Sequence, residues 1–247
     1  DFAVTAVEKK AFFEKGLKEV VISAPVSTIG EDAFGRNELT KVVLPESLLS
    51  IGPFAFEGNK LTTIALPNSV NSIGNNAFAT NSLTSIILPE ALTSLEEATF
   101  SSNKFTEVVI PENITDIEKY VFLGNNELTK VTLPKSLKRM DSRVFPANSV
   151  EKIITHATVP PTITSSSLGS SYLTNLVVVV PEGSLSAYKN NAEWDQYILK
   201  EKPSINFEDT SIAFSETIPL NATSNSGGTI TYEIVQGGTT TASLSGT

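Results

Sequence analysis

The sequence predicts a right-handed solenoid of stacked coils, with a parallel β-sheet along its concave face and an incomplete all-β segment after it. Two observations predict the solenoid. Phenylalanines recur with five successive gaps of 22 residues and one of 23, at Phe12, Phe34, Phe56, Phe78, Phe100, Phe122 and Phe145. An apolar segment that ends in proline recurs in step with them, as in residues 61–67, Leu-Thr-Thr-Ile-Ala-Leu-Pro. Self-similarity at such a period is typical of repeats that stack and share one core.

The first element of each repeat is a short strand. Its apolar residues stand at positions one, four and six, and period-two alternation turns positions four and six inward. Position seven is usually proline, which has no amide hydrogen to donate and so ends the strand. We therefore expect one parallel strand in every coil.

The second element returns the chain to the next strand. In residues 69–74, Ser-Val-Asn-Ser-Ile-Gly, Val70 and Ile73 supply two more inward side chains. The Ala-Phe pair that follows is expected to close the coil on a short helical or 3₁₀ turn, on the other side from the sheet. About six apolar residues per repeat then point inward, which only a stack of coils can bury.

An asparagine also recurs, two residues before each strand segment, at Asn37, Asn59, Asn81, Asn103, Asn126 and Asn148. Stacked amides at the same turn can satisfy unpaired backbone groups and each other. The functional alternative is a polar recognition row. We interpret the phenylalanines and the asparagines as structural columns.

The motif Leu-Thr-x-Val/Ile-x-Leu-Pro-x-Ser-Leu-x-Ser-Ile-Gly-x-x-Ala-Phe-x-x-Asn resembles the BspA-like leucine-rich repeats of bacterial surface proteins, over residues 4–199. Residues 178–189, with Trp194 and Tyr197 after them, resemble that family's closing turn. The ninth position departs from familiar leucine-rich repeats, which have Asn or Cys there; here it is Ser47, Ser69, Ala91, Asn113 and Ser136. Many family members also carry Cys where this chain has its asparagines. The resemblance implies a leucine-rich-repeat solenoid on a cell surface or secreted, in a host-associated bacterium, with adhesion as the usual role.

Three segments are expected: repeats over 1–165, a closing cap over 166–199, and a partial immunoglobulin-like domain over 200–247. The last is polar and rich in Ser, Thr and Gly, with alternating runs such as residues 229–235 and glycine pairs between them. Residues 220–232 carry its resemblance to bacterial immunoglobulin-like domains. Its 48 residues fall short of the ~100 of a complete sandwich. Such modules usually serve as spacers.

Composition excludes several kinds of site. The net charge is −9 with no Lys/Arg cluster, so nucleic acid is not an expected partner. The chain has no cysteine and one histidine, His156, which excludes thiol catalysis, a Ser-His-Asp triad and multi-histidine metal sites. The carboxylate pairs Glu96/Glu97 and Glu31/Asp32 fit a solvated face better than glycoside hydrolysis. No metal, cofactor or transmembrane segment is expected; the longest aliphatic run, residues 176–180, is far below the ~20 residues of a membrane helix.

The outward face of the strands is the candidate binding surface. Position five is apolar in most repeats, and position three beside it is polar or charged. The predicted contact residues are Val21, Val43, Ile87, Val109, Ile154 and Val177, with Glu19, Lys41, Glu107, Lys130 and Lys152. Ala65 and Thr132 complete the apolar row. The competing interpretation is β-propensity, because branched residues suit any strand position.

The sequence therefore predicts a non-catalytic surface module that binds a host or bacterial protein or a glycan. The alternative is a structural or accessory module of a larger surface protein. Hydrolysis of a glycan by the solenoid itself would need two carboxylates ~5–9 Å apart in a cleft. The repeat provides no such cleft.

Overall fold

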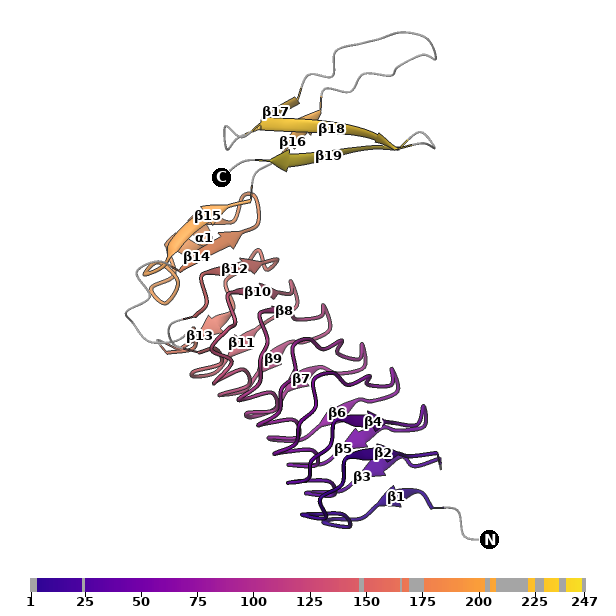
Figure 1. The fold of residues 1–247 in the computed structure, drawn as a ribbon. Coiled ribbons are helices and arrows are strands. Elements are labelled where there is room, and N and C mark those ends of the chain that lie inside the picture. Colours follow the sequence, from indigo (N-terminus) through magenta and orange to yellow (C-terminus); the bar gives the residue numbers. More distant parts are fainter. Residues whose placement is uncertain are drawn as a thin grey trace. The chain divides into compact units, whose positions relative to one another are not determined.

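The computed structural model describes residues 4–23, 25–146, 149–164, 166–168 and 176–202, and beyond them the strands at 205–207, 222–224, 229–235 and 239–245. The chain divides into two compact units, Asp1–Lys200 and Glu201–Thr247. The first is a parallel β-solenoid of about eight turns, as the 22-residue period predicts (Figure 1).

The longer strands form what we call the long-strand face. They are β2 (Glu19–Val21), β4 (Lys41–Val43), β8 (Glu107–Val109), β10 (Lys130–Leu133), β12 (Lys152–Thr155), β14 (Val177–Val180) and β15 (Ile198–Glu201). β2 pairs with β4, and a separate five-stranded sheet has the order β15-β14-β12-β10-β8. Pairing is in register with the repeat, so that Val20 faces Val42 and Val131 faces Ile153. The expected strands at 63–65 and 85–87 are not formed, which corrects the prediction of a strand in every coil.

A second parallel ladder runs along the opposite side, which we call the short-strand face. Its strands are β1 (Ala6–Val7), β3 (Thr28–Ile29), β5 (Ser50–Ile51), β6 (Ser72–Ile73), β7 (Ser94–Leu95), β9 (Asp116–Ile117), β11 (Arg139–Met140) and β13 (Thr162–Ile163). From β3 onward the second residue of each strand is buried and the first points outward. The ladder is interrupted between β6 and β7.

The turn around each column phenylalanine is not helical, which corrects the expected helical or 3₁₀ stretch. The residues two before and two after it have positive φ, for example Asp32 at 56° and Arg36 at 52°. Right-handed helices require negative φ throughout. The N–H groups of Asp32, Phe34 and Arg36 instead donate to carbonyls of the next coil, 2.7–2.9 Å away. Each turn is therefore bonded to its neighbour along the solenoid axis.

The phenylalanines stack in one column inside the solenoid. Ring centroids are 5.2–5.9 Å apart from Phe12 to Phe145, with interplanar angles of 2–15°. All but Phe12 are buried. Offset parallel rings at this spacing are a favourable aromatic arrangement. Aliphatic residues of both faces pack around the column to form one continuous core.

A short helix, α1 (Leu185–Lys189), closes the solenoid after β14. Tyr188 and Trp194 are buried edge to face, with centroids 5.2 Å apart. The Tyr188 hydroxyl donates to the carbonyl of Ala157 at 2.9 Å, and the Trp194 ring N–H donates to the carbonyl of Pro161 at 2.8 Å. Two large side chains thus cover the last coils and satisfy their own polar atoms. Among the described residues, no helix has the length and apolar character needed to span a membrane.

The second unit contains two antiparallel pairs. β16 (Ile205–Phe207) pairs with β17 (Ala222–Ser224), and β18 (Thr229–Val235) pairs with β19 (Thr239–Ser245). The alternating runs at 205–207 and 229–235 do form strands. The immunoglobulin-like assignment of residues 200–247 stays a prediction, because most of the segment lies outside the described residues.

Candidate binding surface

The position-five side chains, which we call the aliphatic column, lie on the long-strand face. In its first half they are exposed: Val21 by 63%, Val43 by 43%, Ile87 by 86% and Val109 by 69%. Ala65 between them is also exposed. In its second half Thr132, Ile154 and Val177 are half-buried. The column is therefore most accessible from Val21 to Val109.

Position three carries the charged residues. Glu19, Lys41, Glu107 and Lys152 are exposed and Lys130 is half-buried. Lys130 pairs with Glu107, its Nζ 3.0 Å from Oε2. The same row is uncharged in the middle, at Thr63 and Ser85. Charge in the position-three row is thus concentrated toward the two ends of the accessible column.

The hydrogen-bond ladder of the long-strand face is interrupted in the middle. The N–H groups of residues 63–65 and 85–87 donate no hydrogen bond to a backbone carbonyl within the described part of the chain. Elsewhere on the face the ladder is closed, for example Ile22 N–H to Val43 O at 3.0 Å and Ile110 N–H to Thr132 O at 2.9 Å. The ladder of the long-strand face is therefore interrupted between β4 and β8.

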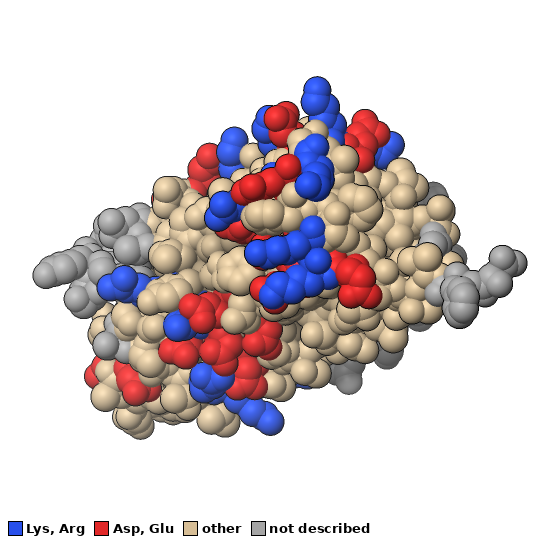
Figure 2. Space-filling model, turned by 90° about the horizontal axis from the view of Figure 1, so that it is seen from below, with Lys and Arg blue, Asp and Glu red and all other residues tan. Residues whose placement is uncertain are grey.

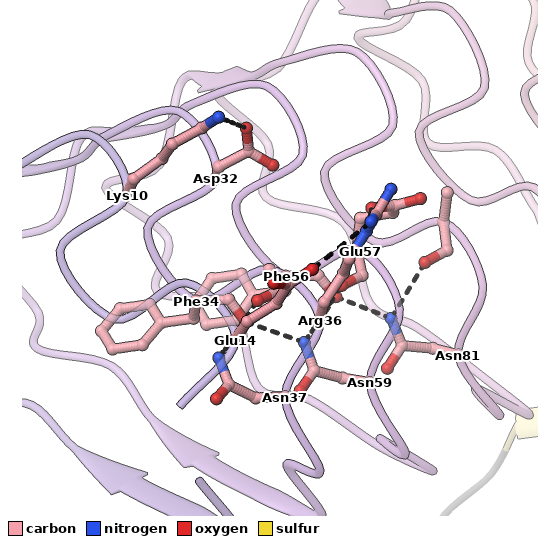
Figure 3. A network of polar contacts seen from close by, with 12 residues as sticks. Lys10, Glu14, Asp32, Phe34, Arg36, Asn37, Phe56, Glu57, Asn59 and Asn81 are labelled. Carbon is pink, nitrogen blue, oxygen red and sulfur yellow. Dashed lines mark hydrogen bonds and ion pairs between the residues drawn. The ribbon is translucent and has the colours of Figure 1, made fainter. Parts of the chain in front are cut away.

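The asparagines lie inside the turns (Figure 3). The Asn37 amide donates to the carbonyls of Phe12, Phe34 and Gly35 at 2.8–3.2 Å, and its oxygen accepts the N–H of Leu17 at 3.0 Å. Asn59, Asn81 and Asn103 are buried and bonded in the same way. Bonds run from side chain to backbone, and none joins two of these amides. The geometry gives this column no exposed polar groups for recognition.

The fifth member of that column is Asn125, not Asn126. Asn125 is buried and donates to the carbonyls of Phe100 and Phe122 at 3.0 and 2.8 Å, whereas Asn126 is exposed. The prediction of Asn126 was wrong because the bond to the phenylalanine carbonyl fixes the asparagine three residues after the ring. The extra residue of that repeat follows the asparagine instead of preceding it. Asn148 lies outside the described residues.

Charged side chains on the turns pair between successive coils. Lys10 pairs with Asp32 at 3.7 Å, and Arg36 lies 3.4 Å from Glu14 and 3.9 Å from Glu57. Basic and acidic side chains are accordingly interspersed over this side (Figure 2). Such exposed pairs contribute ~0–1 kcal/mol each to stability.

On the short-strand face, Arg139 lies 3.2 Å from Asp116, 2.7 Å from Glu118 and 3.6 Å from Asp141. The pKa of Arg139 is raised, first by its hydrogen bond to Glu118. The pKa of Asp116 is lowered, mainly by the hydrogen bond from Thr115. The guanidinium thus occupies the space between three carboxylates.

Hollows in the described part of the chain include one away from the aliphatic column and one that Val21, at the start of the column, helps to line. One, of about 490 Å³, lies on the short-strand face beside Gly52, Gly74, Ser72 and Glu96. The other, of about 590 Å³, is lined by Phe12, Leu17 and other apolar residues of the first coil. Neither holds a paired acid and base.

A family model described as "BspA type Leucine rich repeat region (6 copies)" matches residues 5–125 and 95–192. The chain belongs to this BspA-type leucine-rich-repeat family. No curated protein sequence matches the chain. The family and the fold are typically non-enzymatic.

Solved leucine-rich-repeat structures resemble this BspA-type chain. A Bacteroides ovatus leucine-rich repeat protein is 22% identical with a TM-score of 0.51, over 80% of this chain and 63% of that one. A T. pallidum leucine-rich repeat protein is 28% identical with a TM-score of 0.50, over 61% of this chain and 77% of that one. The chain thus spans less than two thirds of the B. ovatus protein. The first likeness supports the fold alone.

The polar groups considered for chemistry are engaged with neighbours in this BspA-type solenoid. His156 Nδ1 lies 3.2 Å from Glu112, with both side chains about half exposed. Glu97 pairs with Lys119 at 3.2 Å and Glu96 accepts the Ser94 hydroxyl at 2.7 Å. Glu31 and Asp32 pair with Lys9 and Lys10. Within the described ranges, no group of three His, Cys, Asp or Glu side chains is arranged to hold a metal ion.

Proposed function

We propose that this chain is a non-catalytic module that binds a protein partner through the aliphatic column. The observation that carries the proposal is the exposure of Val21, Val43, Ile87 and Val109 in one row. Isolated exposed aliphatic residues are ordinary on any protein, whereas a contiguous apolar strip marks a contact surface. A leucine-rich-repeat fold implies protein binding in general.

β-propensity accounts for part of the column but not for its centre. Val21, Val43 and Val109 lie in strands, where branched residues are favoured whatever they contact. Ile87 lies outside any ladder, and it is the most exposed member at 86%. A side chain that contributes neither to a ladder nor to the core favours a role in contact.

The chemistry of the column favours protein over glycan. Sugar rings stack their C–H groups on aromatic faces, and the aliphatic column contains no aromatic residue. The solenoid buries the column phenylalanines other than Phe12, together with Tyr188 and Trp194. A glycan remains the alternative partner in the experiment below.

Surface location is the second part of the proposal. BspA-like proteins are usually assigned to the cell surface, and the −9 charge suits a soluble exposed module. We propose that residues 200–247 begin an immunoglobulin-like spacer that holds the solenoid away from its anchor. The second candidate function, a structural or accessory module, is favoured if an adjoining domain proves catalytic.

The test replaces Val43, Ile87 and Val109 together with glutamate. Wild type and variant are compared on an array of purified extracellular-matrix proteins and glycans. We expect the variant to keep its circular dichroism spectrum and to lose at least about tenfold in affinity for whichever protein the wild type binds, because three charges would be desolvated in the contact.

The matched control replaces the exposed Val159, which is 75% accessible and outside the aliphatic column, with glutamate. It should bind as wild type does. Equal binding by the folded triple variant would remove the aliphatic column from the interface, and binding to glycans alone would replace the protein partner with a carbohydrate.

A further inference from the structure

We infer that the partner presents an extended polypeptide segment in which basic residues accompany apolar ones, docked along residues 43–109 of the long-strand face. This inference rests on the proposed function and specifies its partner. It follows from two features that lie side by side over residues 43–109: the exposed row of the aliphatic column and an acidic edge beside it.

The acidic edge consists of Glu46, Glu90 and Glu112, which we call the acidic rim. Each follows the proline that ends a strand segment, and each is exposed. Glu46 is three residues beyond Val43, so their Cα atoms lie within ~11 Å. The rim therefore runs beside the aliphatic column, within reach of a lysine side chain on a docked segment.

Most of the rim is free of intramolecular ion pairs. Neither Glu46 nor Glu90 forms one with the residues that the structure describes. Glu112 contacts His156 at 3.2 Å and accepts the N–H of Lys135 at 3.0 Å. Two carboxylates thus remain to pair with a partner, and complementary charge of this kind guides association and selects partners.

The opposite edge carries hydroxyl side chains beside Ile87 and lysines on the adjoining coils. Positions two and three there are Thr62, Thr63, Thr84 and Ser85, all exposed. Lys41 and Lys104 are also exposed, and the N–H of Lys104 donates to the carbonyl of Leu83 at 2.9 Å. The rim is therefore acidic or uncharged from Glu46 to Glu112, whereas the opposite edge carries both signs of charge.

The arrangement of the aliphatic column favours an extended segment. Val43, Ala65, Ile87 and Val109 occupy the same position on four successive coils and are all exposed, so they form one row across the coils. An extended polypeptide can place alternate side chains along such a row. Val43 to Val109 covers three coil spacings of ~4.8 Å, about 14 Å, which an extended segment of about five residues spans at ~3.4 Å each.

The experiment uses fluorescently labelled seven-residue synthetic peptides and the full 247-residue chain. One peptide alternates lysine with valine; the others alternate lysine with serine, glutamate with valine, and serine with valine. Lysine side chains are long and flexible, so they can reach the rim from beside a docked valine. By fluorescence anisotropy, we expect the lysine–valine peptide to bind about tenfold or more tightly than each of the others, and less tightly as salt rises.

Variants locate the contact. Glu46→Lys with Glu90→Lys should weaken lysine–valine binding about tenfold. The matched control, Glu8→Lys with Glu193→Lys, changes the total charge equally at exposed sites away from the rim and should leave binding nearly unchanged. Ile87→Ser should weaken binding, whereas Val159→Ser should not.

Equal binding of the lysine–valine and lysine–serine peptides would overturn the inference, as would equal effects of the two charge-reversed pairs. A preference for the glutamate–valine peptide would mean that the partner is acidic and would also overturn the inference. Self-association of the wild type that Ile87→Ser abolishes would assign the face to a second copy of the chain. These outcomes are separate from the result of the triple-glutamate test, because that test does not depend on the partner's charge.

Discussion

The side-chain amide of Asn59 donates a hydrogen bond to the carbonyl oxygen of Phe34, 3.0 Å away and one coil earlier. The same amide reaches the carbonyls of Phe56 and Glu57 at 3.1 and 3.3 Å, and its oxygen accepts the N–H of Leu39 at 3.0 Å. One buried side chain therefore closes its own turn and joins two coils. The asparagine column therefore links each coil to the one before it.

Asn59→Ala is expected to destabilise the solenoid by at least about 2 kcal/mol, because each buried polar group left without a partner costs about 1–3 kcal/mol. Urea unfolding followed by circular dichroism measures the loss. Asn126→Ala, at an exposed position, should fall within about 0.5 kcal/mol of wild type. Similar losses for both would mean that the buried bonds contribute nothing specific.

Phe78→Ala should cost about 3–5 kcal/mol, because the ring is fully buried between Phe56 and Phe100, with centroids 5.5 and 5.8 Å away. Phe12→Ala should cost much less, since Phe12 is 43% exposed and stacks on Phe34 alone. The free energies of unfolding of the two variants decide this. A larger loss at Phe12 would contradict a column whose interior members carry the stability.

The Glu96 amide should exchange its hydrogen faster than its equivalents in neighbouring coils. Gly74 N–H donates to Ile51 O at 2.8 Å and Glu118 N–H to Leu95 O at 2.9 Å, whereas Glu96 N–H has no such bond where β6 and β7 separate. Protection factors from residue-resolved hydrogen exchange should be about tenfold lower at Glu96. Equal protection at all three amides would show that the ladder is closed.

The sequence offers a reason for that break. At Gly74 an added Cβ would lie 2.6 Å from the nitrogen of Pro53, so the glycine repeats allow close approach of successive coils. After Gly30, Gly52 and Gly74, Glu96 is the first residue at this position to replace glycine with a side chain. The interruption of the short-strand face coincides with this change from glycine to glutamate.

Alkaline pH should weaken the cap. Burial raises the pKa of Tyr188 to about 12, against an ordinary value of 10.0, so the folded state favours the protonated phenol. The stabilising contribution is complete below pH 10 and is lost as pH rises toward 12. The unfolding midpoint of wild type should therefore fall more between pH 10 and 12 than that of Tyr188→Phe. Parallel decreases would assign the alkaline loss to other groups, such as Tyr197, whose pKa burial also raises.

The sequence predicted the solenoid and its core because the 22-residue period places chemically equivalent side chains over one another. It misplaced Asn126 because the asparagine was counted from the following strand, whereas the bond to the Phe122 carbonyl sets its place from the ring. The sequence did not predict the non-helical turns, because positive φ is usually signalled by glycine. Here it occurs at residues such as Lys10, Phe54 and Ala98.

The accessible part of the candidate surface was only partly predictable. Position five points outward in every coil, yet Val21 to Val109 are exposed while Ile154 and Val177 are half-buried. The interruption of the ladder beside Ile87 was also not predictable, since residues 83–89 fit the same motif as the strands around them. Contacts between coils decide both, and a single repeat does not encode them.

The most direct test uses the absence of cysteine from the chain, which allows a single label at a chosen position. Ile87→Cys and Val159→Cys are each coupled to a bulky environment-sensitive fluorophore, and titrated with the protein that wild type binds on the matrix array. We predict that the label at position 87 changes its emission or blocks binding, while the label at 159 does neither. Undisturbed binding with the position-87 label, together with a response at 159, would contradict it.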